Sequence, residues 1–177
     1  MRAALILLVC LLLSGCVTVT GGSHAVDPNN QAEILAKTRA VPNPHQGVVE
    51  VLGPTVISGT RAYTMRSWVT KKGDPIHNHF QVQVEAFFAK RVYLKQVYSR
   101  GSKLKTTLID HERGECGCTS ETVGIELNED QVAAYAHQGL TFEIAGKRAS
   151  VVMTIPPAYF AGVLDAHRRQ RALGAGV

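Results

Sequence analysis

Two cysteines separated by a single glycine, Cys116 and Cys118, are the side chains best suited to chemistry in this chain. Two thiolates at this spacing can bind a soft metal ion such as Zn²⁺ or Cu⁺. His111 lies in the same predicted loop, and His77 and His79 could supply further imidazole ligands. The residue types therefore allow a metal site built from these five side chains.

The same two cysteines can instead form a disulfide, with each other or with another chain. A ring closed by Cys116 and Cys118 contains one intervening residue and would be strained, and strained disulfides are the more easily reduced ones. The sequence leaves three alternatives open: a disulfide that staples a surface loop, a redox centre and a metal site.

His77 and His79 would lie on one face of an extended segment, which suits metal binding. Together with Asn78 they match the His-Asn-His tripeptide of a nuclease motif, but the wider ββα-metal context of those enzymes is missing from the sequence. Asp74-Pro75 precedes them, and such a dipeptide is typical of an exposed turn. The alternative to a metal-binding role is therefore a pair of histidines beside a turn.

A run of cations follows the clearest strand of the sequence. Between residues 90 and 105 there are six cations and no acid, with Tyr93 and Tyr98 interleaved. Such a run could bind anionic lipid headgroups, lipopolysaccharide phosphates or acidic glycans, or it could be a charged edge strand that resists aggregation. The six residues are Lys90, Arg91, Lys95, Arg100, Lys103 and Lys105.

No catalytic signature stands out in the chain. Ser102-Lys103-Leu104-Lys105 matches a Ser-x-x-Lys pattern, but the serine belongs to a predicted hairpin loop and its usual companion motifs are missing. Metalloprotease, phosphate-loop and nucleophile-elbow patterns are also missing. The sequence therefore favours a non-catalytic binding or assembly protein, with a metal-binding or redox module and an envelope hydrolase as alternatives.

The N-terminal segment predicts where the chain is sent. Arg2 gives a basic start, the apolar run from Ala3 to Leu13 has the length of a signal-peptide core, and Ser14 and Gly15 are small residues suited to a cleavage site. A membrane-spanning helix needs roughly 20 apolar residues, so this run is too short to span. Residues 1–15 are expected to be a cleaved signal peptide.

Leu13-Ser14-Gly15-Cys16 resembles the lipobox of bacterial lipoproteins at every position. The resemblance implies that diacylglycerol is joined to the thiol of Cys16, that the peptide is cut before it, and that the new amine is acylated. It also implies outer-membrane sorting, because Val17 stands where an aspartate would retain a Gram-negative lipoprotein at the inner membrane. We therefore expect a lipid-anchored envelope protein on the periplasmic face, with an envelope protein or an anionic envelope polymer, and not nucleic acid, as partner.

Composition fits a single domain in an oxidising compartment. The chain of 177 residues has a formal charge of +5, and removing residues 1–15 takes away one arginine and no acid, which leaves +4. A domain of about 160 residues buries enough surface to fold without a metal or a disulfide. Since Cys16 is used for lipid, Cys116 and Cys118 remain as one pair.

Residues 16–46 are expected to form a lipidated, flexible tether, because they are rich in Gly, Ser, Asn, Pro and His. Within them, Gln31 to Ala40 could form a short helix. From Gly47 onward β-branched residues alternate with polar ones, and Phe80 to Phe88 is the clearest half-buried strand. Asp110 to Glu121 is expected to be a loop.

The predicted fold is mainly β (α+β), an antiparallel sandwich or curled sheet spanning 47–177. One helix is inserted at 129–138, with Asn128 as its N-cap, Gln131 in a capping box and Gly139 at its end. A C-terminal helix is expected over about 158–172, after Pro156-Pro157. No internal repeat is found.

Overall fold

The computed structural model describes residues 25–70, 79–114 and 117–174. It confirms a mainly β, α+β fold with two antiparallel sheets and three helices, α1 (Gln31–Lys37), α2 (Glu129–Gln138) and α3 (Pro157–Gly174). The strands are β1 (Arg39–Asn43), β2 (Val48–Leu52), β3 (Val56–Ser58), β4 (Arg61–Val69), β5 (His79–Phe88), β6 (Leu94–Ser99), β7 (Ser102–Leu104), β8 (Thr106–Arg113), β9 (Thr119–Asn128), β10 (Leu140–Gly146) and β11 (Ser150–Ile155).

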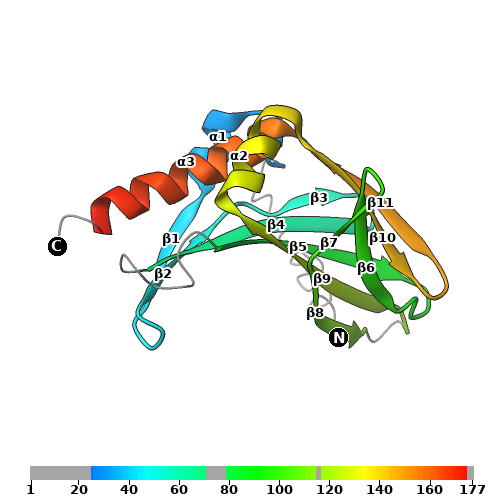
Figure 1. Ribbon diagram of the computed structural model, residues 1–177. Helices are drawn as coiled ribbons and strands as arrows, with labels where there is room; N and C mark the ends of the chain where they lie inside the picture. The colour runs from blue at the N-terminus through cyan, green and yellow to red at the C-terminus, as the bar shows by residue number, and fades with distance from the viewer. Residues whose placement is uncertain (1–24, 71–78, 115–116, 175–177) are drawn as a thin grey trace, which may run out of the picture.

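The larger sheet, sheet A, has the strand order β1-β2-β4-β5-β9-β8, and β3 pairs with β4 beyond the end of β2. Its inner face is apolar because side chains alternate along each strand. Phe80, Val82 and Val84 of β5 are fully buried, as the alternation predicts, and Val123 and Ile125 continue the core on β9. Figure 1 shows α2 and α3 over one part of this face and the second sheet over another.

The second sheet, sheet B, has the order β11-β10-β6-β7. Arg100 and Gly101, with φ of 49° and 77°, form the tight turn between β6 and β7, and tight two-residue hairpin turns need such positive φ values. After β7 the chain passes Lys105 and enters β8, so one extended segment links sheet B to the edge of sheet A.

Helix α2 has the predicted bounds and the predicted cap. The Asn128 side chain accepts from Gln131 N, and the Gln131 side chain accepts from Asn128 N. Glu129 in its first turn binds Arg168 and Arg171 of α3 at 2.9 and 2.7 Å. Local capping therefore begins the helix, and an ion-pair cluster fixes it to α3.

The folded body begins before Gly47, which corrects the predicted tether. Asn30 caps α1, whose Ile34 is completely buried, and α1 packs against α3. Strand β1 then pairs with β2 along the edge of sheet A, with Pro42 opposite Val49. An edge position explains how a proline-containing strand is tolerated, since the missing donor can face solvent.

The predicted loop from Asp110 to Glu121 is wrong over most of its length. Strand β8 runs to Arg113 and β9 begins at Thr119, so the connection is shorter than expected. A register shift between Leu108 and Asp110 marks an irregularity in β8. Among the helices in the described ranges, none combines the length and the apolar character needed to cross a membrane.

Candidate functional site

The structure separates the predicted metal ligands that it describes. His79 begins β5 opposite Asn128, whereas Thr119, next to Cys118, lies opposite Phe88 at the other end of the same ladder. Ten strand residues span roughly 30 Å, so His79 does not join Cys118 in one site. Cys16, His77 and Cys116 lie outside the described residues.

His111 lies nearer to Cys118 than His79 does. It is exposed on β8 and pairs with Glu121 of β9, while Cys118 O accepts a hydrogen bond from Gly114 N at 2.9 Å. Within the described ranges no group of three or more His, Cys, Asp or Glu side chains is placed to hold a metal ion. A disulfide, redox or metal role for the Cys116/Cys118 pair stays a prediction.

His79 belongs instead to a polar network on the face of sheet A that points away from the helices. Its Nε2 lies 2.7 Å from Glu126 Oε2, and its ring stacks on Trp68 with centroids 5.1 Å apart. Gln81 donates to the other Glu126 oxygen at 2.7 Å and accepts from Arg66 Nε at 2.9 Å. These strands bring together side chains that are up to 60 residues apart in sequence.

The network continues to Glu50, whose carboxylate lies 3.4 Å from Arg66 Nη1, and the Arg66 guanidinium lies 4.9 Å from the centre of the Trp68 ring. A groove of about 690 Å³ lies beside this network, lined by Gln46, Val48, Arg66, Trp68, His79, Gln81 and Glu126. Gly124 on β9 makes room for Gln81, because a Cβ there would lie 2.8 Å from Gln81 Nε2. We call this connected set the polar network of sheet A.

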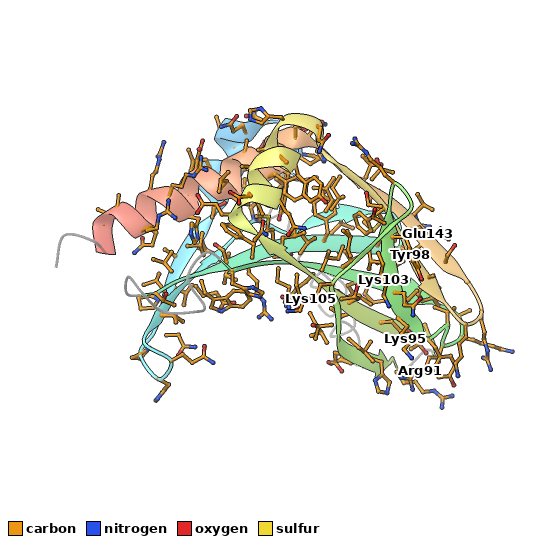
Figure 2. The ribbon with its side chains drawn as sticks, in the orientation of Figure 1. Arg91, Lys95, Tyr98, Lys103, Lys105 and Glu143 are labelled. Atoms are coloured by element: carbon orange, nitrogen blue, oxygen red, sulfur yellow. The ribbon has the colours of Figure 1, made fainter. Side chains whose placement is uncertain are left out.

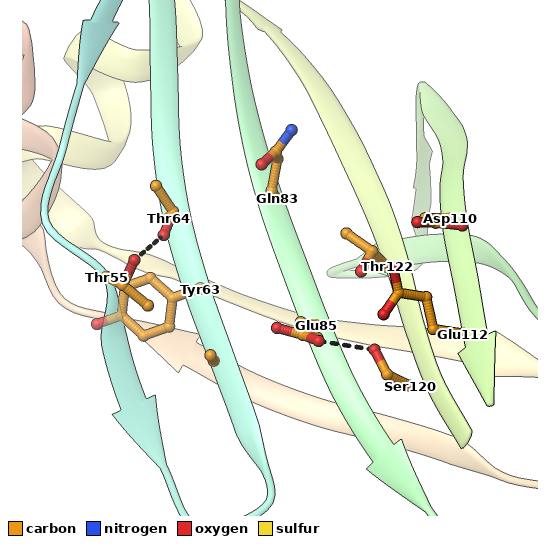
Figure 3. A pocket seen from close by; sticks show the side chains of 10 residues that line it. Thr55, Tyr63, Thr64, Gln83, Glu85, Asp110, Glu112, Ser120 and Thr122 are labelled. Atoms are coloured by element: carbon orange, nitrogen blue, oxygen red, sulfur yellow. Dashed lines mark hydrogen bonds between the residues drawn. The ribbon is translucent and has the colours of Figure 1, made fainter. Parts of the chain in front are cut away.

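A second hollow of about 260 Å³ lies on the same face of sheet A. Figure 3 shows its hydroxyl and carboxylate side chains, with a hydrogen bond between the hydroxyls of Thr55 and Thr64 at 2.7 Å and one from Ser120 to Glu85 at 2.6 Å. Asp110 and Glu112 of β8 line its far side. This face of sheet A is therefore polar, and several of its groups already hydrogen-bond to one another.

Sheet B presents a different surface. Two segments, 90–105 and 140–155, supply its four strands, and together they contain eight cations and one acid, Glu143. Their formal charge is +7, so the rest of the chain carries −2 of the total of +5. Figure 2 shows Arg91, Lys95, Lys103 and Lys105 along the side of the molecule formed by β6 and β7. We call the following set the basic surface: Lys90, Arg91, Lys95, Arg100, Lys103, Lys105, Lys147 and Arg148.

The cations of the basic surface lack acidic partners within the described part of the chain. The ion pairs found there involve Lys37, Arg66, His79, Arg168 and Arg171, all outside sheet B. Arg100 donates to the neutral side chain of Gln138, and Arg148 donates to the carbonyl of Arg91. The positive charge of this surface is therefore not neutralised by the described residues.

One end of the basic surface is organised around Tyr93. Arg91 Cζ, Lys147 Nζ and Arg148 Cζ lie 4.7, 5.6 and 5.5 Å from the centre of its ring. Arg91 comes from the β5–β6 connection, and the other two cations come from the turn between β10 and β11. We call these four residues the Tyr93 cluster.

A buried carboxylate holds this cluster in place. Glu121, which is 1% exposed, accepts backbone hydrogen bonds from Val92, Tyr93 and Leu94 at 2.6, 3.0 and 2.7 Å. Tyr93 has φ of 60°, a conformation that is uncommon for a residue with a side chain. The three hydrogen bonds stabilise this backbone conformation, because the Glu121 carboxylate accepts from the N–H groups of three successive residues.

Sequence reasoning found the six cations of 90–105 but missed Lys147 and Arg148. They lie more than forty residues later, and only the pairing of β10 with β6 brings their turn to Tyr93. The missed signal was a basic pair, Lys147-Arg148, directly after the turn glycine Gly146.

Comparison with family models, with curated proteins and with solved structures finds no match for this chain.

Proposed function

We propose that this protein is a lipid-anchored, non-catalytic binding module of the cell envelope, and that its basic surface binds an anionic envelope polymer. The observation that carries the proposal is the charge of sheet B: eight cations, one acid, and no acidic partner for the cations among the described residues. Surfaces of one sign attract oppositely charged ligands and raise their local concentration. A repeating anionic polymer can contact several of these cations at once.

The arrangement of the cations favours a polymer over a single small ion. They are distributed over β6, β7 and four connections, so the basic surface is extended. Edge-strand protection would account for charges on β7, but it does not account for Lys147 and Arg148, which lie in a turn. An extended surface suits a ligand whose charges repeat along its length.

The proposed anchor is the lipidated Cys16, with sorting to the outer membrane and the periplasmic face. Ala25, where the described chain starts, is nine positions after Cys16, and nine steps of extended chain can reach at most about 30 Å. More than one acyl chain is needed for stable anchoring, and the resemblance to lipoproteins provides three. Confinement to a membrane surface would raise the effective concentration of the module near its polymer.

A model polyanion tests the binding proposal directly. Immobilised dextran sulfate should bind the protein, and uncharged dextran should not. The triple variant Lys95→Gln/Lys103→Gln/Lys105→Gln should bind at least about tenfold more weakly, because each cation near an anionic surface contributes on the order of 1 kcal/mol. Binding of the unchanged protein should weaken as salt is added.

The matched control removes three exposed cations elsewhere, in Arg39→Gln/Arg113→Gln/Arg169→Gln, and changes the net charge equally. Its affinity should fall much less than that of the sheet B variant. Equal losses in the two triple variants would show that net charge alone matters and would overturn the proposed surface. The anchor is tested separately: a Cys16→Ser form that still sediments with membranes at high salt, without detergent, would contradict lipid anchoring.

A further inference from the structure

We infer that the Tyr93 cluster is a discrete binding site for a single phosphate monoester group on the anionic ligand. The inference rests on the proposed function, since it assigns one chemical group of the ligand to one place on the basic surface. Three cations that share one aromatic ring form a more concentrated charge than the separate lysines of β6 and β7.

The geometry gathers the three charges around one ring. Any two of them lie within about 11 Å of each other, the sum of the two longer distances to the ring centre. This upper bound is of the same order as the screening length of about 8 Å at physiological salt, so the potentials of the three charges add near the ring. Tyr93 is 39% exposed, and its ring is therefore accessible to a ligand from solvent.

The backbone under the cluster is tightly packed. Arg148 N donates to Val92 O at 3.3 Å, and Arg148 Nη1 to Arg91 O at 3.4 Å, so the two connections are joined. At Gly146 a Cβ would lie 2.7 Å from Val92 O, which shows how close they approach. Together with the three hydrogen bonds to Glu121, these contacts hold the cations in place before a ligand arrives.

The charge of the cluster favours phosphate over carboxylate. Two of the three cations are arginines, whose planar guanidinium groups match the oxygens of phosphate in a two-pronged hydrogen bond. A phosphate monoester carries between one and two negative charges near neutral pH, whereas a carboxylate carries one. Cation–π contacts with Tyr93 stabilise the three like charges only weakly, so an anion of higher charge compensates them best.

Titration with small sugars tests the site without a polymer. N-acetylglucosamine 6-phosphate should shift the backbone amide resonances of residues 91–94 and 147–149 in the detergent-solubilised protein. Unphosphorylated N-acetylglucosamine should shift none of them, and glucuronic acid should bind more weakly than the sugar phosphate. Arg148→Gln should weaken the sugar phosphate about tenfold or more, as expected for a lost charge-assisted hydrogen bond, while Lys103→Gln should change it less than about twofold.

The outcomes separate this inference from the proposed function. Equal binding of the sugar phosphate and glucuronic acid, or equal losses in the two variants, would overturn the site. If dextran sulfate binds but the sugar phosphate does not, the inference fails and the basic surface stands. If dextran sulfate does not bind, the proposed function fails as well. For the Cys16→Ser form, which has no lipid of its own, vesicles of phosphatidylcholine with and without phosphatidic acid show whether a lipid can supply the phosphate. Binding that needs phosphatidic acid and that Arg148→Gln abolishes would support the site.

Discussion

The two sheets use charged side chains in opposite ways. In the polar network of sheet A, Arg66 lies between Glu50 and Gln81, and Glu126 lies between Gln81 and His79, so the charges of this network have partners. On sheet B, eight cations have no acidic partner among the described residues. A cation on an antiparallel strand is therefore structural in one place and available for a ligand in the other, and the difference lies in its neighbours.

Glu121 connects the two regions, and its removal should have the largest effect. Glu121→Ala would leave three N–H groups without an acceptor, two of them buried and that of Tyr93 partly buried, and each buried donor costs roughly 1–3 kcal/mol. We expect the free energy of unfolding to fall by about 3 kcal/mol or more, measured by urea denaturation.

The control for this prediction is Glu143→Ala, which removes an exposed carboxylate on sheet B. Its free energy of unfolding should change by less than about 0.5 kcal/mol. A loss of similar size in both variants would show that Glu121 does not hold the 92–94 backbone in the way described.

Glu126→Gln tests whether the polar network of sheet A is structural. The amide cannot accept from both Gln81 and His79 as the carboxylate does, so we expect a loss of about 1–2 kcal/mol in urea denaturation. Affinity for dextran sulfate should stay unchanged. Glu112→Gln, on the exposed strand β8, is the control and should alter stability by less than about 0.5 kcal/mol. A fall in polyanion affinity with Glu126→Gln would show that sheet A also takes part in ligand binding, which would contradict the proposed difference between the two sheets.

Two arginines of α3 do have an acidic partner, Glu129 of α2, and the pH dependence of stability tests this ion-pair cluster. Burial, the largest single influence, would raise the pKa of Glu129, but hydrogen bonds and charges of Arg168 and Arg171 together lower it below its usual range. The stability gained is therefore present above the ordinary pKa and is lost as pH falls through the lowered value. Between about pH 5 and 3, the wild-type protein should lose more stability than Glu129→Gln, whose deficit at neutral pH should be about 1 kcal/mol.

Asp130→Asn is the matched control for the pH measurement, because Asp130 is exposed in the same helical turn. Its stability should fall with pH in parallel with the wild type over this range. If Glu129→Gln also falls in parallel, the ion-pair cluster between α2 and α3 does not contribute the expected pH dependence.

Features that depend on nearby residues were predictable from the sequence. The capping box of α2 joins residues three apart, and the buried face of β5 follows from strict alternation, so both were found. The second half of strand β8, from Asp110 to Arg113, was expected to be a loop because this edge strand is mostly exposed on both faces and shows no apolar period. Strand β1 was missed because its proline and polar neighbours resemble a linker until β2 pairs with them.

The functional geometry was the least predictable part. His79 and Glu126 are brought together by the register of β5 on β9, and the sequence contains no local sign of that register. The Tyr93 cluster likewise needs β10 beside β6 before Lys147 and Arg148 approach the ring. Runs of like charge are visible in a sequence, but whether each charge has a partner is decided by tertiary structure.

The smallest predicted effect bears on the comparison between the sheets most directly. If the lysines of sheet B were structural, their removal would destabilise the protein. If they are held ready for a ligand, they repel one another in its absence, and Lys95→Gln/Lys103→Gln/Lys105→Gln should raise the free energy of unfolding by roughly 0.5 kcal/mol at low salt. Because salt screens this repulsion, the gain should disappear near 1 M salt, where the screening length is about 3 Å. A stability loss at low salt would mean that these lysines stabilise the fold, and that sheet B resembles sheet A after all.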